Sequence, residues 1–157
     1  MTFRAVAIDS SFARDVRQGR RDAFGGAAEL WRAADRYPCR HCLDEARMGS
    51  DVLLISYKPL ESETPYAGRG PIFLCAEPCQ AYLASNAVPE IVVTRRINLR
   101  AYDSSGKMLY LHSRLAEGSE VQLHIGELLA DETVREVHAH TALHGCYLCR
   151  FIRDQPF

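Results

Sequence analysis

Cysteine is the residue type of this sequence best suited to chemistry, and its six copies are grouped in three close pairs. The pairs are Cys39 with Cys42, Cys75 with Cys79, and Cys146 with Cys149. A single buried cysteine usually acts as a small hydrophobic residue. Three close pairs in a chain of 157 residues are more typical of metal binding or thiol redox chemistry. Because no signal peptide is visible at the N-terminus, we expect a cytoplasmic protein, in which disulfides are rare.

Two of the pairs have the spacing Cys-x-x-Cys, in the segments Cys39-Arg40-His41-Cys42 and Cys146-Tyr147-Leu148-Cys149. Such a turn lets two thiolates bind one cation, and two turns complete a tetrahedral zinc site. We therefore predict a structural zinc ion bound by Cys39, Cys42, Cys146 and Cys149. In a regular strand Cys146 and Cys149 would point to opposite faces, so this site requires a turn at Gly145 or Tyr147. His41 could replace one of the cysteines.

The pair Cys75 and Cys79 competes with these two. Pro78 suits the first position of a helix, and we expect that helix to continue through Tyr82 and Leu83. Cys79 would then lie in the first helical turn, where the helix dipole stabilises a thiolate as a ligand or as a reactive group. The alternative is that both cysteines are small buried residues at a corner between strand and helix.

A second candidate site consists of Arg100, Tyr102, His138 and His140. Arg100 and Tyr102 share one face of a predicted strand, and His138 and His140 share one face of another. If these strands are neighbours, the four side chains line a polar pocket, and the arginine favours a small anionic ligand. The alternative is that these side chains hydrogen-bond to one another on a solvated sheet face.

The remaining pattern predicts the elements that position these residues. Strands are expected over residues 3–8, 52–57, 72–75, 91–102, 108–112, 133–140 and 146–152, and the turn over 103–106 indicates a hairpin. Helices are expected behind Asp9, over 27–37, from Pro78, and from Val121 to Leu129 behind a capping pattern. We therefore predict a single α+β domain over residues 1–157, with a mostly antiparallel mixed sheet and a few short helices.

Composition excludes several classes of protein. The hydrophobic fraction of 47% and the charged fraction of 25% are typical of globular domains. A net charge of -1 provides no field that would attract nucleic acid. The longest apolar runs, such as residues 52–57, are far too short to span a bilayer. We expect neither a nucleic-acid partner nor a membrane partner.

Several longer motifs carry a family resemblance. They are Tyr37-Pro38-Cys39-Arg40-His41-Cys42-Leu43, Pro65-Tyr66-Ala67, Gly70-Pro71-Ile72-Phe73-Leu74, Arg100-Ala101-Tyr102-Asp103 and Gly145-Cys146-Tyr147-Leu148-Cys149-Arg150. Together they resemble a bacterial family known only as domain of unknown function 1203, over nearly the whole chain. The resemblance implies a small bacterial single-domain protein without an established activity.

The same resemblance implies a second set of metal ligands. Members of the family often carry histidine where this chain has Cys75, and histidine and cysteine replace one another as zinc ligands. Other members keep counterparts of Cys39 and Cys146 but lack the remaining four cysteines. The competing ligand set is therefore Cys42, Cys75, Cys79 and Cys149.

Three function classes remain open at this point. The first is a zinc-stabilised module that binds a small anionic ligand or a protein partner, and the second is a thiol redox protein that uses a Cys-x-x-Cys pair. A thioredoxin-like site requires this pair at the start of a helix, whereas Cys39 follows Pro38 and a predicted helix end. The third class is nucleic-acid binding through a zinc fold, which the balanced charge and the absence of a basic aromatic stripe disfavour. A metal-dependent hydrolase is a further alternative, but no His-Glu-x-x-His motif supports it. The pattern therefore favours the zinc-stabilised module.

Overall fold

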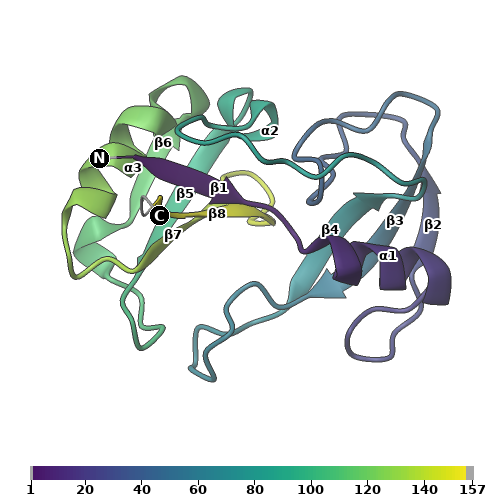
Figure 1. Ribbon diagram of the computed structural model, residues 1–157, viewed down its shortest axis with the longest axis horizontal. Coiled ribbons are helices and arrows are strands. Elements are labelled where there is room, and N and C mark those ends of the chain that lie inside the picture. Colours follow the sequence, from purple (N-terminus) through teal and green to yellow (C-terminus); the bar gives the residue numbers. More distant parts are fainter. Residues whose placement is uncertain (1, 155–157) are drawn as a thin grey trace.

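Two antiparallel sheets form the framework of the computed structural model, which describes residues 2–154 (Figure 1). The strands of the larger sheet are β1 (Phe3–Val6), β5 (Arg96–Tyr102), β6 (Arg114–Glu117), β7 (Glu136–Thr141) and β8 (Tyr147–Arg153), in the spatial order β1-β8-β7-β5-β6. The smaller sheet consists of β2 (Glu29–Arg32), β3 (Asp51–Tyr57) and β4 (Gly70–Cys75), in chain order.

The helices are few and short, so the fold is α+β as the sequence predicts. They are α1 (Ser10–Gly19), α2 (Glu90–Val93) and α3 (Val121–Ala130), together with the 3-10 turns η1 (Tyr110–His112) and η2 (Gly118–Glu120). Helix α1 begins behind Asp9, whose carboxylate accepts hydrogen bonds from the backbone N–H groups of Ser11 and Phe12. This is the N-cap that the sequence predicts. Within residues 2–154, no helix combines the length and the hydrophobicity needed to cross a bilayer.

The larger sheet has one apolar face and one polar face. On the apolar face, Leu99 of β5 and Val137 of β7 pack with Ile125 of α3 in the main hydrophobic core. On the polar face, Arg100 of β5 lies opposite His138 of β7 in the antiparallel register. Because side chains alternate along each strand, this register turns the polar face of β5 and β7 away from α3.

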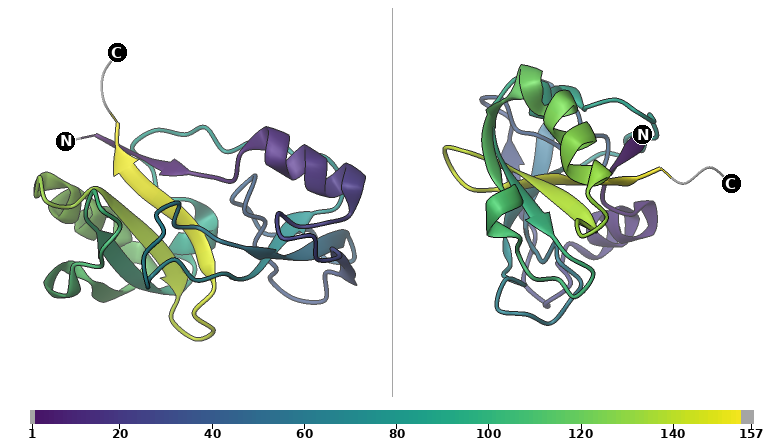
Figure 2. Two further views of the ribbon diagram at one scale, coloured as in Figure 1. Left: turned by 90° about the horizontal axis from the view of Figure 1, so that it is seen from below. Right: turned by 90° about the vertical axis from the view of Figure 1, so that its left-hand side faces the viewer.

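The smaller sheet is covered by α1. Ala13 and Val16 of this helix pack with Leu53 of β3 and Leu74 of β4, and Figure 2 shows α1 lying against that sheet. The N-terminal segment therefore links the two sheets: β1 is a strand of the larger sheet, and α1 packs against the smaller one (Figure 1).

Two of the predicted helices are wrong. The segment 27–37 forms strand β2 instead, because Leu30 and Trp31 pair with Leu53 and Val52 at the edge of the smaller sheet. The segment that follows Pro78 contains no helix up to residue 89. This segment is an extended connection from β4 to α2, and along it the backbone N–H of Asn86 donates a hydrogen bond to the carbonyl of Phe3.

Two of the predicted strands are displaced. Residues 90–93 are helix α2, so β5 starts only at Arg96. The predicted hairpin partner over 108–112 contributes a single bridge, from Met108 to Tyr102, and the next residues form η1. On the side of β5 away from β7, the pairing strand is instead β6, which begins at Arg114.

Candidate metal centre and adjoining polar cavity

Four cysteines meet beside helix α1. The Sγ atoms of Cys39, Cys42, Cys75 and Cys79 all lie within 4.8 Å of one another, and we call these four residues the cysteine cluster. Cys39 is fully buried, and the other three are half-buried. All six cysteines of the chain are free thiols. The cluster therefore combines four soft ligand atoms in one small volume.

The size of the cluster fits a tetrahedral metal site. Four sulfur atoms around a zinc ion, at Zn–S distances of about 2.3 Å, are separated from one another by about 3.8 Å. The Sγ atoms of Cys39 and Cys79 are 3.9 Å apart, close to that edge length. The donor set of four thiolates is typical of structural zinc and of iron–sulfur sites.

The local backbone explains how two nearby cysteines converge. After Cys39 the chain turns back so that the N–H of Leu43 bonds to the carbonyl of Cys39 at 3.0 Å. Leu43 adopts a left-handed conformation with φ of 53°, which a leucine rarely adopts. This turn places Cys42 beside Cys39, and the end of β4 adds Cys75 from the neighbouring strand.

Hydrogen-bond donors surround the sulfur atoms. The backbone N–H of Cys75 donates to the Sγ atom of Cys39 at 3.3 Å. The guanidinium of Arg17, on α1, donates to the Sγ atom of Cys79 at 3.1 Å. His41 Nδ1 also lies 3.2 Å from that Sγ atom. Such groups around a thiolate centre orient the ligands and offset their negative charge.

The same contacts shift the proton affinities of the four thiols in opposite directions. Hydrogen bonding with Cys42 and Cys75 lowers the pKa of Cys39 to about 6. Hydrogen bonding with Cys39 and its other neighbours also lowers the pKa of Cys79, and the pKa values of Cys42 and Cys75 rise because these thiols keep the shared protons. Cys39 and Cys79 therefore lose their protons more readily than an ordinary cysteine, whereas a bound cation has to displace the protons of Cys42 and Cys75.

The third cysteine pair lies outside the cluster. Cys149 is buried in the main core, and Cys146 lies in the turn before β8. Cys149 pairs with Ala139 in regular register and shares the core face of β8 with Phe151. A bulge between Cys149 and Tyr147 then places Tyr147 opposite His140 on the polar face. Each predicted ligand set is therefore brought together only in part: Cys39 and Cys42 of the first set, and Cys42, Cys75 and Cys79 of the second.

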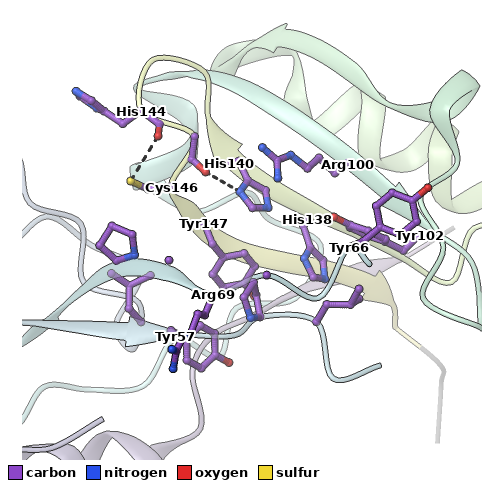
Figure 3. A pocket seen from close by; sticks show the side chains of 17 residues that line it. Tyr57, Tyr66, Arg69, Arg100, Tyr102, His138, His140, His144, Cys146 and Tyr147 are labelled. Atoms are coloured by element: carbon purple, nitrogen blue, oxygen red, sulfur yellow. Dashed lines mark hydrogen bonds between the residues drawn. The ribbon is translucent and has the colours of Figure 1, made fainter. Parts of the chain in front are cut away.

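Arg100, Tyr102, His138 and His140 line a single cavity of about 250 Å³, which we call the polar cavity. It lies between the polar face of the larger sheet and strands β3 and β4, and Tyr57 and Tyr147 complete its walls (Figure 3). The pocket in which the sequence analysis places these four residues is therefore present as a cavity. Arg100 is half-buried and takes part in no ion pair among residues 2–154.

The two histidines of the polar cavity have different surroundings. His138 Nε2 lies 2.7 Å from the carboxylate of Glu136, which Arg150 also contacts. His140 Nδ1 lies 3.0 Å from the carbonyl of Gly145. Burial lowers the pKa of His140 to about 3, and the positive charge of Arg100 adds to this effect. His140 is therefore neutral, and its ring is 6% exposed.

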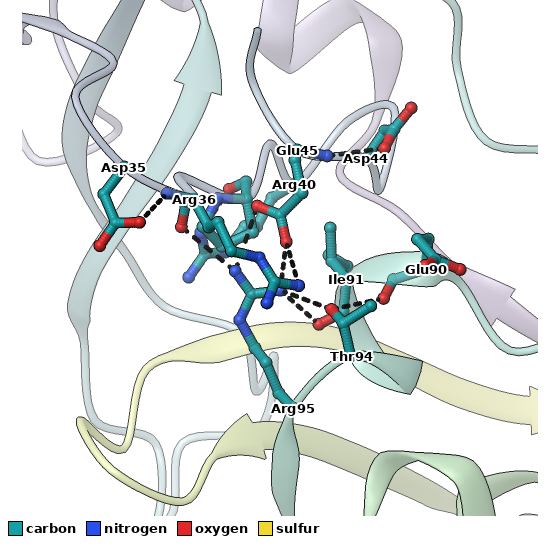
Figure 4. Close-up of polar contacts among 10 residues, drawn as sticks. Asp35, Arg36, Arg40, Asp44, Glu45, Glu90, Ile91, Thr94 and Arg95 are labelled. Atoms are coloured by element: carbon teal, nitrogen blue, oxygen red, sulfur yellow. Dashed lines mark hydrogen bonds and ion pairs between the residues drawn. The ribbon is translucent and has the colours of Figure 1, made fainter. Parts of the chain in front are cut away.

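Two arginines connect the turn that holds Cys39 and Cys42 with the larger sheet (Figure 4). Arg95, which precedes β5, contacts Glu45 with both terminal nitrogens, and its Nη2 lies 3.1 Å from Glu45 Oε2. Arg40 is 2% exposed and donates to the carbonyls of Tyr147 and Pro38. The segment that holds Cys39 and Cys42 is thereby fixed against β8 on one side and β5 on the other.

A second cavity, of about 590 Å³, lies on the face of the smaller sheet that α1 does not cover. Its walls include Trp31, Tyr37 and Phe73, and the rings of Tyr37 and Phe73 stack at a centroid distance of 4.6 Å. This cavity is not predictable from a helix over 27–37, which would not place Trp31 in a sheet beside Phe73. In a strand the same residue pairs with β3 and faces the same side of the sheet as Phe73.

Comparison with known protein families gives a match that includes both the turn at Cys39 and Cys42 and strand β8. The family model described as protein of unknown function (DUF1203) matches residues 36–153, which is most of the chain. The chain belongs to the DUF1203 family. No curated protein and no solved structure matches it.

The DUF1203 match contains the whole cysteine cluster and the four predicted residues of the polar cavity. It does not include α1, which supplies Arg17 and Ser10 to the surroundings of the cluster. A signal for the grouping of these four cysteines was present in the sequence. Cys75 and Cys79 are much closer to the first pair along the chain than Cys146 and Cys149 are, and their spacing is within the range of zinc ligands.

Proposed function

We propose that this protein is a zinc-stabilised module that binds a small anionic ligand in the polar cavity. The observation that carries the proposal is the cysteine cluster, whose four thiols have the spacing of a tetrahedral shell. Strand β4 connects the cluster with the cavity, because it carries Cys75 at its end and also contributes Ile72 to the cavity wall.

The nature of the ligands supports a structural role for the metal. Catalytic zinc sites usually have three protein ligands and keep a fourth position for water or substrate, whereas four thiolates fill a tetrahedral shell. Such a closed site contributes to folding and leaves no position for hydrolytic chemistry. In this protein it would join the turn at Cys42 to the end of β4 at Cys75.

Charge supports an anionic ligand in the polar cavity. Glu136, the carboxylate nearest to the histidines, is already bound by His138 and Arg150. Arg100, in contrast, has no acidic partner among residues 2–154. A half-buried guanidinium binds carboxylate or phosphate oxygens through two parallel hydrogen bonds. A small anion would provide the charge that the surrounding residues do not provide for Arg100.

The metal part of the proposal is tested by elemental analysis and thiol counting on the purified protein. We expect one zinc per chain, with Cys146 reactive before chelation, the four clustered thiols reactive only after it, and the buried Cys149 reactive only in denaturant. Iron in place of zinc, or clustered thiols that react without chelation in a protein that holds no metal, would overturn this part. A disulfide in place of the metal would favour thiol redox chemistry.

The ligand part is tested by calorimetric titration of the zinc-loaded protein with propionate and with inorganic phosphate. We expect at least one of them to bind, and Arg100→Gln to abolish binding. Arg96→Gln is the matched control, because Arg96 lies on the same strand but in an exposed pair with Glu117. If neither anion binds, or if both variants bind as the unmodified protein does, the polar cavity is not an anion site.

A further inference from the structure

The hydrogen bond made by His140 determines which of its ring nitrogens carries the proton. Nδ1 lies 3.0 Å from the carbonyl oxygen of Gly145. A carbonyl oxygen can only accept, so Nδ1 is the donor. In a neutral imidazole the other nitrogen is then an acceptor. The Nε2 atom of His140 therefore presents a lone pair.

This lone pair has no partner in the protein. Within residues 2–154, His140 Nε2 is the buried side-chain nitrogen or oxygen for which no hydrogen-bond partner is found. Buried polar groups are nearly always hydrogen-bonded, and each exception calls for an explanation. Because His140 also lines the polar cavity, a molecule in that cavity can reach it only with a hydrogen-bond donor.

Arg100 imposes the opposite requirement on the same molecule. Its guanidinium only donates, so the ligand must offer it an acceptor. Asn98 and Arg100 of β5 pair with His140 and His138 of β7, so Arg100 and His140 are diagonal neighbours on one sheet face. Figure 3 shows both side chains at the same end of the cavity. One small molecule bound at this end of the cavity would therefore lie beside both side chains.

Resting on the proposed anion binding, we infer that the ligand is a short hydroxycarboxylic acid. Its carboxylate binds Arg100, and its hydroxyl group donates a hydrogen bond to Nε2 of His140. A single half-buried guanidinium matches the single charge of a carboxylate better than the charge of about −1.5 to −2 on a phosphate monoester. Arg69, which also lines the cavity, is exposed and lies over the ring of Phe24.

The walls and the volume suit a ligand of this size. The rings of Tyr57, Tyr102 and Tyr147 form apolar surfaces around the polar end of the cavity, and such surfaces can cover a short carbon chain. A cavity of about 250 Å³ lies just below the usual range for drug-sized ligands, roughly 300–1,000 Å³. It therefore suits a small metabolite.

The test compares acids that differ only in the hydroxyl group. The zinc-loaded protein is titrated calorimetrically with lactate and propionate, and with 3-hydroxybutyrate and butyrate. We expect one hydroxy acid to bind about tenfold more tightly than its partner, the effect of one additional hydrogen bond. His140→Phe should reduce the preference to about onefold. Arg100→Gln should weaken all four acids alike.

A second measurement does not depend on a variant that folds. The ring-nitrogen chemical shift of His140 Nε2 should move on addition of the preferred hydroxy acid and stay in place with the acid that lacks the hydroxyl. Equal affinities within both pairs would overturn the inference and leave anion binding intact. A preference that persists in His140→Phe, or an unmoved Nε2 resonance, would also overturn it. If none of the four acids and no phosphate binds, the proposed function fails as well.

Discussion

His41 joins the start of helix α1 to the cysteine cluster. Its Nδ1 atom lies 3.2 Å from the Sγ atom of Cys79, and its Nε2 atom lies 2.9 Å from the hydroxyl oxygen of Ser10. The ring is 3% exposed, so these two contacts account for its polar atoms. A side chain held in this way orients the sulfur atom without being one of the four clustered ligands.

The first prediction follows from this contact. His41→Phe keeps an aromatic ring in the buried position but removes both nitrogens. We expect zinc affinity to fall about 10- to 100-fold, as is typical when a partner of a metal ligand is lost. Affinity is measured by competition with a chromophoric chelator. His112→Phe is the control, because His112 contacts Asp131 far from the cluster along the chain. Equal affinity in the two variants would show that His41 does not support the centre.

The second prediction separates the clustered cysteines from the others. Cys75→Ser should reduce the zinc content and lower stability by on the order of 4 kcal/mol, which for this chain length is a Tm loss of roughly 8–16 °C. Cys146→Ser should retain both zinc and Tm, since Cys146 lies in the turn before β8. Zinc content and thermal unfolding are measured on both variants. Loss of zinc in Cys146→Ser alone would favour the ligand set that contains Cys146 and Cys149.

Local sequence patterns, such as apolar runs, a helical stripe and an N-cap residue, made much of the fold predictable. The strands at 52–57 and 72–75, the helix behind Asp9 and the α3 stripe are all present within a few residues of their predicted bounds. The prediction of a helix over 27–37 was wrong because Leu30 and Trp31 fit a helical stripe and an edge strand equally well. Only the pairing of β2 with β3 decides between them, and that pairing is not encoded in the local pattern.

The candidate sites were predictable to different degrees. The polar cavity follows from two strands with period-two spacing, and the pairing of Arg100 with His138 provides the rest. The ligand set depends on which loops meet in three dimensions. The left-handed conformation at Leu43, which helps to turn the chain after Cys39, has no evident signal in the sequence.

The third prediction concerns pH. The pKa of His140 is about 3 in the folded protein, lowered by burial, Arg100, His138 and Arg40, and about 6.5 in the unfolded chain. Below about pH 6.5 the unfolded chain therefore binds a proton that the folded protein does not, so stability falls as pH decreases toward 3. Relative to His140→Phe, we expect the unmodified protein to lose about 1–2 kcal/mol between about pH 7 and pH 5.

This pH effect is measured by urea unfolding of both proteins at each pH, in a buffer free of carboxylates. Taking the difference between the two proteins removes the contribution of groups that they share, including the cysteine cluster. Parallel pH profiles would mean that His140 takes up its proton over the same pH range in the folded protein as in the unfolded chain, which would contradict a pKa lowered by burial.

The fourth prediction tests the close packing of η2 against the end of α2. Gly118, in η2, is buried against the end of α2, and a Cβ atom there would collide with the backbone carbonyl oxygens of Val92 and Arg95. Gly118→Ala should therefore lower the free energy of unfolding by about 1–3 kcal/mol. Gly126→Ala is the matched control, because nothing lies within 4 Å of a Cβ at this helical position, and it should stabilise by about 0.5–1 kcal/mol. Urea midpoints measure both changes, and a Gly118→Ala protein as stable as the unmodified one would contradict the close packing of η2 on α2.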